Sequence, residues 1–374
     1  MSQSNALLKK DMKKMTHRNW RIAAAGISAT AMLIMGACAE APTEETAGSS
    51  ETEEAETNDD FLACAVSDEG SWEDKSFNEA AYEGLLEAEE EFGISIRTAE
   101  SNSVEDFEPN LTAMVNAGCD VIFAVGFDLA DSTNEAAEAH PDSHFVTIDG
   151  HSEGHENLKA VEYASAEPSY LAGYLAAAYS STKVVGTYAG VNVPAVTTFM
   201  DGFYYGAKAY EEDTGTEVTV LGYDPENPDA GDYVGDFSDS GRAKSISAGL
   251  IENDADVIYP VAGGLFSATS EAINESGKDV VFIGVDKDIA VTSPEYSDQV
   301  LVSVEKRMTN AVFEIIEQTM ADGFDSESYV GSLENEGTVL SSFHDFEGDI
   351  DQEILDRLQE LEEEISSGSL DPSQ

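Results

Sequence analysis

From residue 61 onward, short apolar runs alternate with longer segments whose apolar residues recur every three or four positions. The short runs are typical of strands buried on both faces of a parallel sheet, and the longer segments have the period of an amphipathic helix. The pattern predicts strands at 62–66, 94–98, 121–125, 145–148, 160–163, 184–188, 217–223, 257–259, 280–285 and 301–304. It predicts helices at 76–92, 107–117, 129–139, 168–179, 196–211, 240–252, 266–275, 307–321 and 350–365.

This alternation of strands and helices indicates an α/β fold with two lobes. A chain of 374 residues is too long for one compact core. Each lobe is expected to be a doubly wound parallel sheet with helices on both faces, and a ligand cleft is expected between the lobes, as in periplasmic-type binding proteins. We assign residues 61–163 and 291–327 to the first lobe, and residues 164–290 and 328–374 to the second.

The first 60 residues lack this rhythm and predict an exported, lipid-anchored protein. Residues 1–37 begin with basic residues, and their apolar stretch is too short to span a bilayer comfortably. The small residues before Cys38 resemble a bacterial lipobox, so 1–37 is interpreted as a signal peptide and Cys38 as the lipidated first residue; a plain signal peptide or short anchor is the alternative. Residues 38–60 are acidic without any basic residue, which predicts a disordered tether on the extracytoplasmic face of the cell membrane.

The charge of the chain excludes one class of partner. With 75 acidic and only 18 basic residues, the formal net charge is −57. A nucleic-acid partner is therefore not expected, because no basic stripe is present to neutralise phosphates. Acidity on this scale is typical of a solubility adaptation and says little about the ligand.

The three cysteines allow one disulfide in the mature protein. If Cys38 carries the lipid, Cys64 and Cys119 remain in an oxidising, exported setting. Cys64 lies in the first predicted strand and Cys119 directly precedes the third. A disulfide is sterically possible if those strands are neighbours; two buried free thiols are the alternative.

The polar residues of interest follow the carboxyl ends of predicted strands. They are Asp68, the segment 126–131, the segment 190–199, the pair Gly263 and Gly264, and Asp286. Ligands of open parallel sheets bind beyond these strand ends. An acidic surface without a site has no reason to concentrate its polar residues there, so this shared position predicts a binding site.

The loop from Asp68 to Asn78 supplies a carboxylate, an aromatic ring and an amide at the start of one helix. These groups suit a flat polar ring. Ser76 and Glu79 have the spacing of a capping box at that helix start. Trp72, in the middle of the loop, is expected either to pack the loop or to lie on the rim of the cleft.

Seven motifs occur in order and resemble the basic membrane protein family, the purine nucleoside receptor A-like lipoproteins that bind substrates for ATP-binding-cassette (ABC) importers. The resemblance covers roughly residues 61–345. The motifs are Asp74-Lys-Ser-Phe-Asn78, Asp120-Val-Ile-Phe-Ala-Val-Gly-Phe127, Tyr170-Leu-Ala-Gly173, Phe199-x-x-Gly-Phe203, Ala262-Gly-Gly264, Ile283-Gly-Val-Asp286 and Val300-Leu-Val-Ser-Val-x-Lys306. The resemblance implies nucleosides, with purines first, as cargo and a permease and ATPase as partners; we expect a monomer without a cofactor and without enzyme activity.

The family resemblance also implies which residues hold the base. By position, Phe77 and Phe199 correspond to the two rings that sandwich a purine. Asp68 and Asn78 would then bind the edge of the base, because a carboxylate accepts hydrogen bonds and an amide both donates and accepts them. The alternative for either phenylalanine is an ordinary place in the core.

The resemblance further implies a sugar end of the site. Asp131 and Asp286 match the family's ribose-holding carboxylates, and Lys306 matches a lysine near the ribose. Gly263 and Gly264 would let the backbone approach the sugar closely.

Three rival functions follow from the same residues. A nucleosidase needs a tight carboxylate cluster at one strand end to bind a metal, whereas the candidate carboxylates are spread over both lobes. A sugar-binding protein, or a receptor that presents its ligand to a membrane sensor, has the same fold and remains an alternative. No metal site is predicted at the histidines of residues 140–155, because Pro141 breaks the helix that would align the first two.

Overall fold

The computed structural model describes residue 58 and residues 60–374. The predicted signal peptide, the lipidation site Cys38 and the tether up to residue 57 lie outside these residues. Within the described part of the chain, no helix has both the length and the apolar character needed to cross a bilayer.

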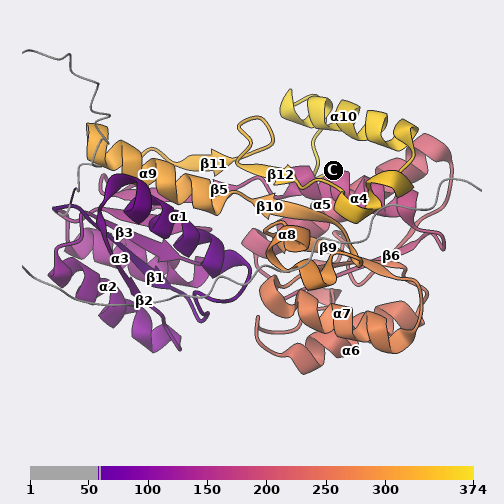
Figure 1. The fold of residues 1–374 in the computed structure, drawn as a ribbon, viewed down its shortest axis with the longest axis horizontal. Coiled ribbons are helices and arrows are strands. Elements are labelled where there is room, and N and C mark those ends of the chain that lie inside the picture. The colour runs from indigo at the N-terminus through magenta and orange to yellow at the C-terminus, as the bar shows by residue number, and fades with distance from the viewer. Residues whose placement is uncertain (1–57, 59) are drawn as a thin grey trace, which may run out of the picture. The chain divides into compact units, whose positions relative to one another are not determined.

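The first lobe is built on a six-stranded sheet in the order β11-β5-β4-β3-β1-β2. All of its strand pairs are parallel. Helices α1 and α9 pack together on one face and α2 and α3 cover the other (Figure 1). Its strands are β1 (Leu62–Ser67), β2 (Ser95–Ala99), β3 (Val121–Val125), β4 (Phe145–Ile148), β5 (Leu158–Tyr163) and β11 (Tyr329–Gly331). Its helices are α1 (Phe77–Phe92), α2 (Phe107–Ala117), α3 (Ala130–Ala139) and α9 (Met308–Asp322).

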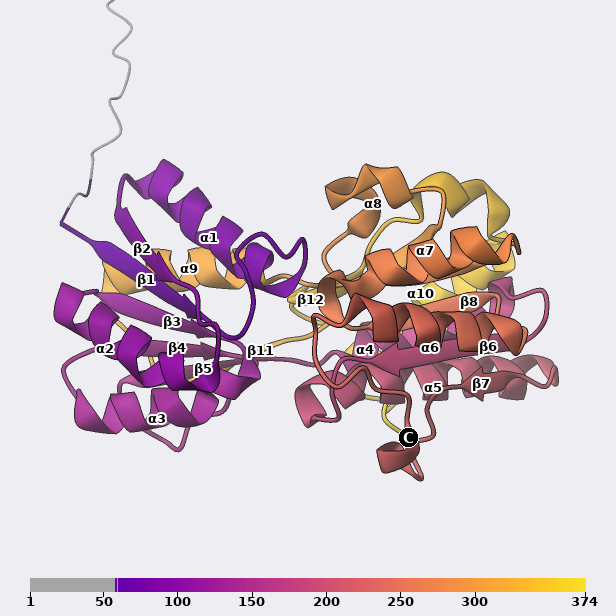
Figure 2. The same ribbon diagram turned by 90° about the horizontal axis from the view of Figure 1, so that it is seen from below.

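The second lobe repeats the same strand order in a sheet β12-β10-β9-β8-β6-β7. Only the edge strand β12 runs antiparallel to its neighbour. Helices α4, α5 and α10 pack on one face, and α6 and α7 on the other (Figure 2). The strands are β6 (Val184–Ala189), β7 (Thr219–Leu221), β8 (Val257–Val261), β9 (Val281–Asp286), β10 (Val300–Lys306) and β12 (Thr338–Leu340). The helices are α4 (Ala166–Tyr179), α5 (Pro194–Thr214), α6 (Ser240–Glu252), α7 (Phe266–Ser276), α8 (Ile289–Thr292) and α10 (Gln352–Ser366).

Two doubly wound α/β lobes confirm the predicted fold class. The chain crosses from one lobe to the other in the segments that join β5 to α4, β10 to α9, and β11 to β12. The placement of residues 291–327 in the first lobe is wrong for β10, which lies in the second sheet beside β9, and the placement of residue 328 onward in the second lobe is wrong for β11. A buried apolar strand carries no signal in its own sequence for which of two sheets it joins.

A disulfide links Cys64 of β1 to Cys119, which directly precedes β3. The two strands are neighbours in the first sheet, and the Cα atoms of the cysteines lie 5.9 Å apart. The structure therefore favours the disulfide over the pair of free thiols.

Candidate functional site

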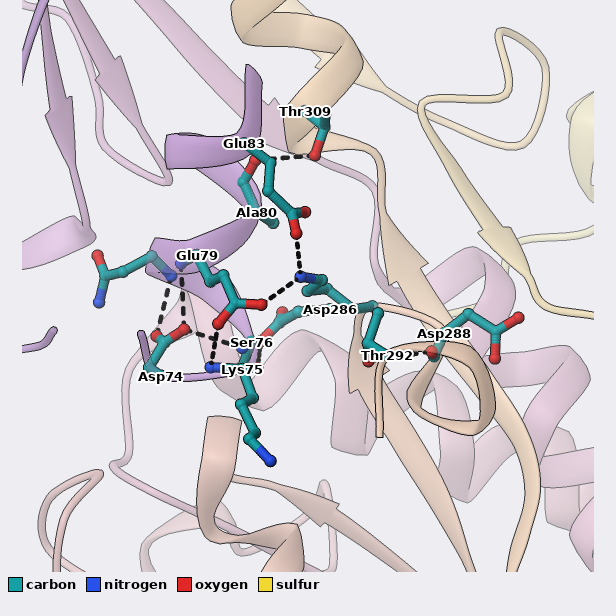
Figure 3. A network of polar contacts seen from close by, with 12 residues as sticks. Asp74, Lys75, Ser76, Glu79, Ala80, Glu83, Asp286, Asp288, Thr292 and Thr309 are labelled. Atoms are coloured by element: carbon teal, nitrogen blue, oxygen red, sulfur yellow. Dashed lines mark hydrogen bonds and ion pairs between the residues drawn. The ribbon is translucent and has the colours of Figure 1, made fainter. Parts of the chain in front are cut away.

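The start of helix α1 carries the loop that meets the second lobe. Asp74 accepts hydrogen bonds from the backbone amides of Ser76, Asn78 and Glu79 at 2.8, 2.9 and 3.1 Å (Figure 3). The predicted capping box is wrong, because the Ser76 side chain makes no cap bond and Glu79 accepts instead from the backbone amide of Lys75. With the helix start satisfied by Asp74, the Ser76 hydroxyl donates to Asp286 Oδ2 of the second lobe at 2.7 Å.

Asp68 and Asn78 lie together at the end of β1. Asn78 Nδ2 donates to Asp68 Oδ1 at 3.2 Å, while Asn78 Oδ1 is buried without a hydrogen-bond partner in the described part of the chain. Burial raises the pKa of Asp68 to about 7, the bond from Asn78 acts against this rise, and nearby carboxylates add to it. Gly126 lies so close that a Cβ there would be 2.1 Å from Asp68 Oδ2, so the site requires glycine at this position.

Trp72, in the middle of the same loop, packs into the core of the first lobe. Its ring lies 5.6 Å from that of Tyr82 on α1, and its backbone amide donates to Glu100. Of the two roles expected for this residue, the structure supports packing.

Lys306, at the end of β10, connects the aromatic residues of both lobes. Its Nζ lies 5.4 Å from the ring centre of Phe77 in the first lobe and 4.8 Å from that of Phe199 in the second. The Tyr163 ring centre is 5.6 Å away, and the ammonium forms an ion pair with Asp149. The two predicted sandwich residues therefore face the same ammonium, from opposite lobes.

Phe199 is held by close contact between its helix and a neighbour. Helix α5 lies against α4 at three glycines, where an added Cβ would clash with backbone oxygens: at Gly173 with Phe203 O at 2.1 Å, at Gly202 with Ala166 O at 2.2 Å and at Gly206 with Tyr170 O at 1.9 Å. These contacts explain why the sequence has glycine within two helices, where it is otherwise unfavourable. They fix α5 and, with it, the Phe199 ring.

Asp286 and Asp149 occupy equivalent places in the two lobes. Asp149 directly follows β4 and Asp286 is the last residue of β9, and each has a left-handed backbone, with φ of 68° at Asp286 and 60° at Asp149. This conformation is uncommon outside glycine and is often found at functional sites. Burial raises the pKa of Asp286 to about 6, although Lys306 and the hydrogen bond from Ser76 lower it.

Asp149 was not predicted as a site residue from the sequence. A signal was available, because Asp149 directly follows the predicted strand 145–148, just as Asp286 follows the strand 280–285. No matched motif of the family included it.

Gly263 and Gly264 follow β8 and face the first lobe. A Cβ at Gly264 would lie 2.7 Å from the carbonyl oxygen of Asp74, and Gly263 has a left-handed φ of 54°. The glycine pair thus admits the loop of Asp74 to Ser76. Its predicted contact with a sugar stays a prediction.

Asp131 is the candidate residue that the structure does not bring to this cluster. Its side chain is 92% exposed and lies 3.8 Å from His151. Asp128, in the preceding turn, is exposed; partial desolvation of its carboxyl raises its pKa, and its charge in turn raises the pKa of Asp68. Asp128 is therefore the carboxylate of this segment that is electrostatically connected to the site.

A second ion pair between the lobes was also missed. Lys287, next to Asp286, contacts Glu79 Oε1 at 2.8 Å and Glu83 Oε1 at 2.9 Å on α1. Its side chain is only 8% exposed. The spacing of Glu79 and Glu83 on one helix face was visible in the sequence, but the partner from the other lobe was not.

The assembled residues suit binding of a neutral molecule. Aromatic rings from both lobes surround one ammonium, and four carboxylates lie in or beside the same region: Asp68, Asp74, Asp149 and Asp286. Aromatic rings bind a flat face, and carboxylates accept hydrogen bonds from hydroxyl and amino groups. Two α/β lobes of one topology, with polar residues of both meeting at their strand ends, define a substrate-binding protein of the solute-receptor type.

The family follows from comparison with known proteins. Residues 61–369 match the family described as ABC transporter substrate-binding protein PnrA-like, and the chain belongs to this family. The ABC transporter nucleoside-binding protein BmpA of Lactococcus lactis is 29% identical over 85% of this chain and 90% of its own. Basic membrane protein A of Borreliella burgdorferi is 29% identical over 65% of this chain and 68% of its own. The resemblance found in the sequence is therefore confirmed.

A solved structure shows the same fold. An ABC transporter solute-binding protein from Aeropyrum pernix superposes with a TM-score of 0.75, at 23% identity, over 83% of this chain and 92% of its own. The family match, and not this likeness in fold, identifies the protein as an ABC transporter substrate-binding protein of the PnrA-like family.

Proposed function

We propose that this protein captures nucleosides, with purines preferred, at the extracytoplasmic face of the cell membrane and delivers them to the permease and ATPase of an ABC importer. The observation that carries the proposal is the pair of rings, Phe77 and Phe199, which come from different lobes and face the same ammonium of Lys306. The nucleoside-binding relative from Lactococcus lactis supports the same ligand class.

In this proposal the base lies between the two rings and its edge meets Asp68 and Asn78. The buried Asn78 Oδ1 has no partner among the described residues, so it is available to accept a hydrogen bond from an amino group or ring N–H. Asp68 has a pKa raised to about 7, so near neutral pH it donates a hydrogen bond when protonated and accepts when ionised. Such a pair serves several purines.

The sugar lies toward Asp286 and Lys306. Ribose hydroxyls are donors and acceptors at once, so a carboxylate and an ammonium satisfy both roles. Asp286 is already held in place by the Ser76 hydroxyl of the opposite lobe. A ligand that contacts both lobes stabilises the arrangement in which they meet, which is the form we expect the permease to recognise.

Charge makes the proposal more specific. Four carboxylates against one lysine disfavour an added phosphate, so nucleoside monophosphates are expected to bind at least a hundredfold more weakly than nucleosides.

The test is calorimetric titration of the mature protein with inosine, adenosine, guanosine, cytidine, ribose, glucose and adenosine monophosphate. We expect tight binding of the purine nucleosides, weaker binding of cytidine and at least a hundredfold weaker binding of the monophosphate. Binding of ribose or glucose without any nucleoside would refute the proposal in favour of a sugar receptor. The anchor is tested separately, since Cys38→Ser should release the protein from the membrane fraction without changing its affinity.

A further inference from the structure

We propose that Asp149 is a positioning residue of the ligand site, which acts by holding the Lys306 ammonium toward the sugar end of the ligand. This rests on the proposed function for the identity of the ligand. The role is distinct from that of Asp286, which accepts a hydrogen bond from Ser76 of the opposite lobe and is expected to contact the ligand directly.

The backbone fixes the Asp149 carboxylate in one place. Asp149 has a left-handed φ of 60°, which costs about 1 kcal/mol or more for a residue with a side chain. Its amide donates to Val161 O at 2.9 Å, and Gly150 packs so tightly that an added Cβ would lie 2.1 Å from Thr147 Oγ1. A strained conformation that is constrained on both sides is not the product of a loose surface loop.

The carboxylate is directed at Lys306. Among the described residues, Asp149 is the one carboxylate that contacts Lys306 Nζ, and the two side chains are 10% and 3% exposed. An ammonium has three N–H donors. Asp149 takes one of them, and the faces of Phe77, Phe199 and Tyr163 surround the remainder without offering a strong acceptor. The other N–H groups are therefore left for a ligand.

A positioning role differs from a merely structural ion pair in what it predicts for ligands. A structural pair stabilises the protein, and its loss lowers the affinity for every ligand in proportion to unfolding. A positioning residue instead changes the affinity for the part of the ligand that Lys306 meets. If that part is the sugar, loss of Asp149 affects nucleosides and spares free nucleobases.

The experiment is a double-mutant cycle read out by calorimetry with inosine and with hypoxanthine. Asp149→Asn is expected to weaken inosine binding at least tenfold and hypoxanthine binding less than threefold. Lys306→Met should do the same, and the double variant should be no worse than Lys306→Met alone, because Asp149 then has nothing to position. Asp131→Asn, an exposed carboxylate of the same lobe, is the matched control and should leave both affinities unchanged.

Two results would overturn the inference: wild-type inosine affinity in Asp149→Asn, or effects of the two single changes that multiply in the double variant. If Asp149→Asn does not fold, Asp149→Glu keeps the charge and displaces it by one methylene, and should still weaken inosine at least threefold while hypoxanthine is unchanged. Wild-type inosine affinity in that variant would likewise count against the positioning role. If the wild type binds a sugar and no nucleoside, the proposed function fails. The same double-mutant cycle with that sugar then still measures the coupling between Asp149 and Lys306.

Discussion

Of the ion pairs that join the lobes in the described part of the chain, those of Lys306 and Lys287 contain a buried lysine, and they differ in their surroundings. The ammonium of Lys306 meets Asp149 inside a group of aromatic rings, with both side chains buried. The ammonium of Lys287 is equally buried, but its partners Glu79 and Glu83 on α1 are 25% and 42% exposed. A lysine–carboxylate ion pair between the lobes thus occurs once among groups that suit a ligand and once beside solvent. Burial of a charge alone does not mark a binding site; its neighbours do.

The largest effect is expected from Lys306→Met. Under the proposed function, this change removes an N–H donor to the sugar; it also leaves Asp149 and Asp286 without their cation, which is costly for buried carboxylates. Nucleoside affinity should fall about a hundredfold, or about 2.7 kcal/mol. Calorimetry measures the loss, and Lys244→Met, at a surface ion pair of the second lobe, is the control. Equal affinities in the two variants would contradict the assignment of Lys306 to the site.

Removal of either ring should weaken purine binding at least tenfold. Stacking on one face of a base contributes about 1–3 kcal/mol, so Phe77→Ala and Phe199→Ala should each lose that contact. Phe92→Ala is the matched control on the same helix as Phe77, because its ring packs on Phe313 at 4.9 Å and not on Lys306. The control should lower the melting temperature and keep the affinity. Unchanged purine affinity in both test variants would refute the sandwich.

Lys287→Met tests the second ion pair and sharpens the comparison. Because Lys287 connects the lobes without meeting the rings, its loss should weaken inosine and hypoxanthine alike, by about threefold to tenfold. Small-angle scattering of the ligand-free variant should show a larger radius of gyration as the lobes separate. A loss confined to inosine would instead place Lys287 in the ligand site.

The last prediction concerns the effect of pH on stability and involves no change in ligand affinity. Burial raises the pKa of Asp68 to about 7, so the folded protein binds this proton more tightly than the unfolded chain does. Stability from this group is therefore present at low pH and is lost as pH rises through about 7. Between pH 7.5 and 5.5 the gain from Asp68 is about 1 to 2 kcal/mol, and Asp286, with a pKa of about 6, adds in the same direction.

Denaturant unfolding of the ligand-free protein at both pH values measures this gain. Asp68→Asn should reduce it, because an amide does not titrate, while Asp131→Asn at the exposed carboxylate should not. A wild-type protein that is more stable at pH 7.5 than at pH 5.5, with the same slope in Asp68→Asn, would contradict the assignment.

The sequence predicted the fold well because periodicity and strand ends are local properties. Helix α2, for example, begins and ends at the predicted residues, and the structure brings Asp68 and Asn78 of the predicted loop together. The errors arose where the partner lies far away in the chain. Ser76 has the position and residue type of an N-cap, but its hydroxyl donates to the Asp286 carboxylate of the other lobe. The Asp74 carboxylate accepts the backbone N–H groups at the helix start instead.

The same reason explains why two other residues that join the lobes were not predicted. Asp149 pairs with Lys306, and Lys287 pairs with Glu79 and Glu83 on α1. In each case the partner lies in a distant part of the chain, so the sequence around the residue carries no signal for the contact. Asp131 shows the reverse case, because the family resemblance placed it in the site while its side chain, in the first turn of α3, is exposed to solvent.

The route of the chain has a consequence for the order in which the lobes can fold during synthesis. Helix α9 covers the face of the first sheet that α1 also occupies, yet it follows the whole of β6 to β10 in the chain. When residue 163 has been synthesised, the surface of α1 at Gly84, against which Val312 of α9 packs, is still uncovered. The first lobe therefore cannot complete its core before most of the second has been synthesised. A chain of this design depends on protection from aggregation until nearly all of its length is available.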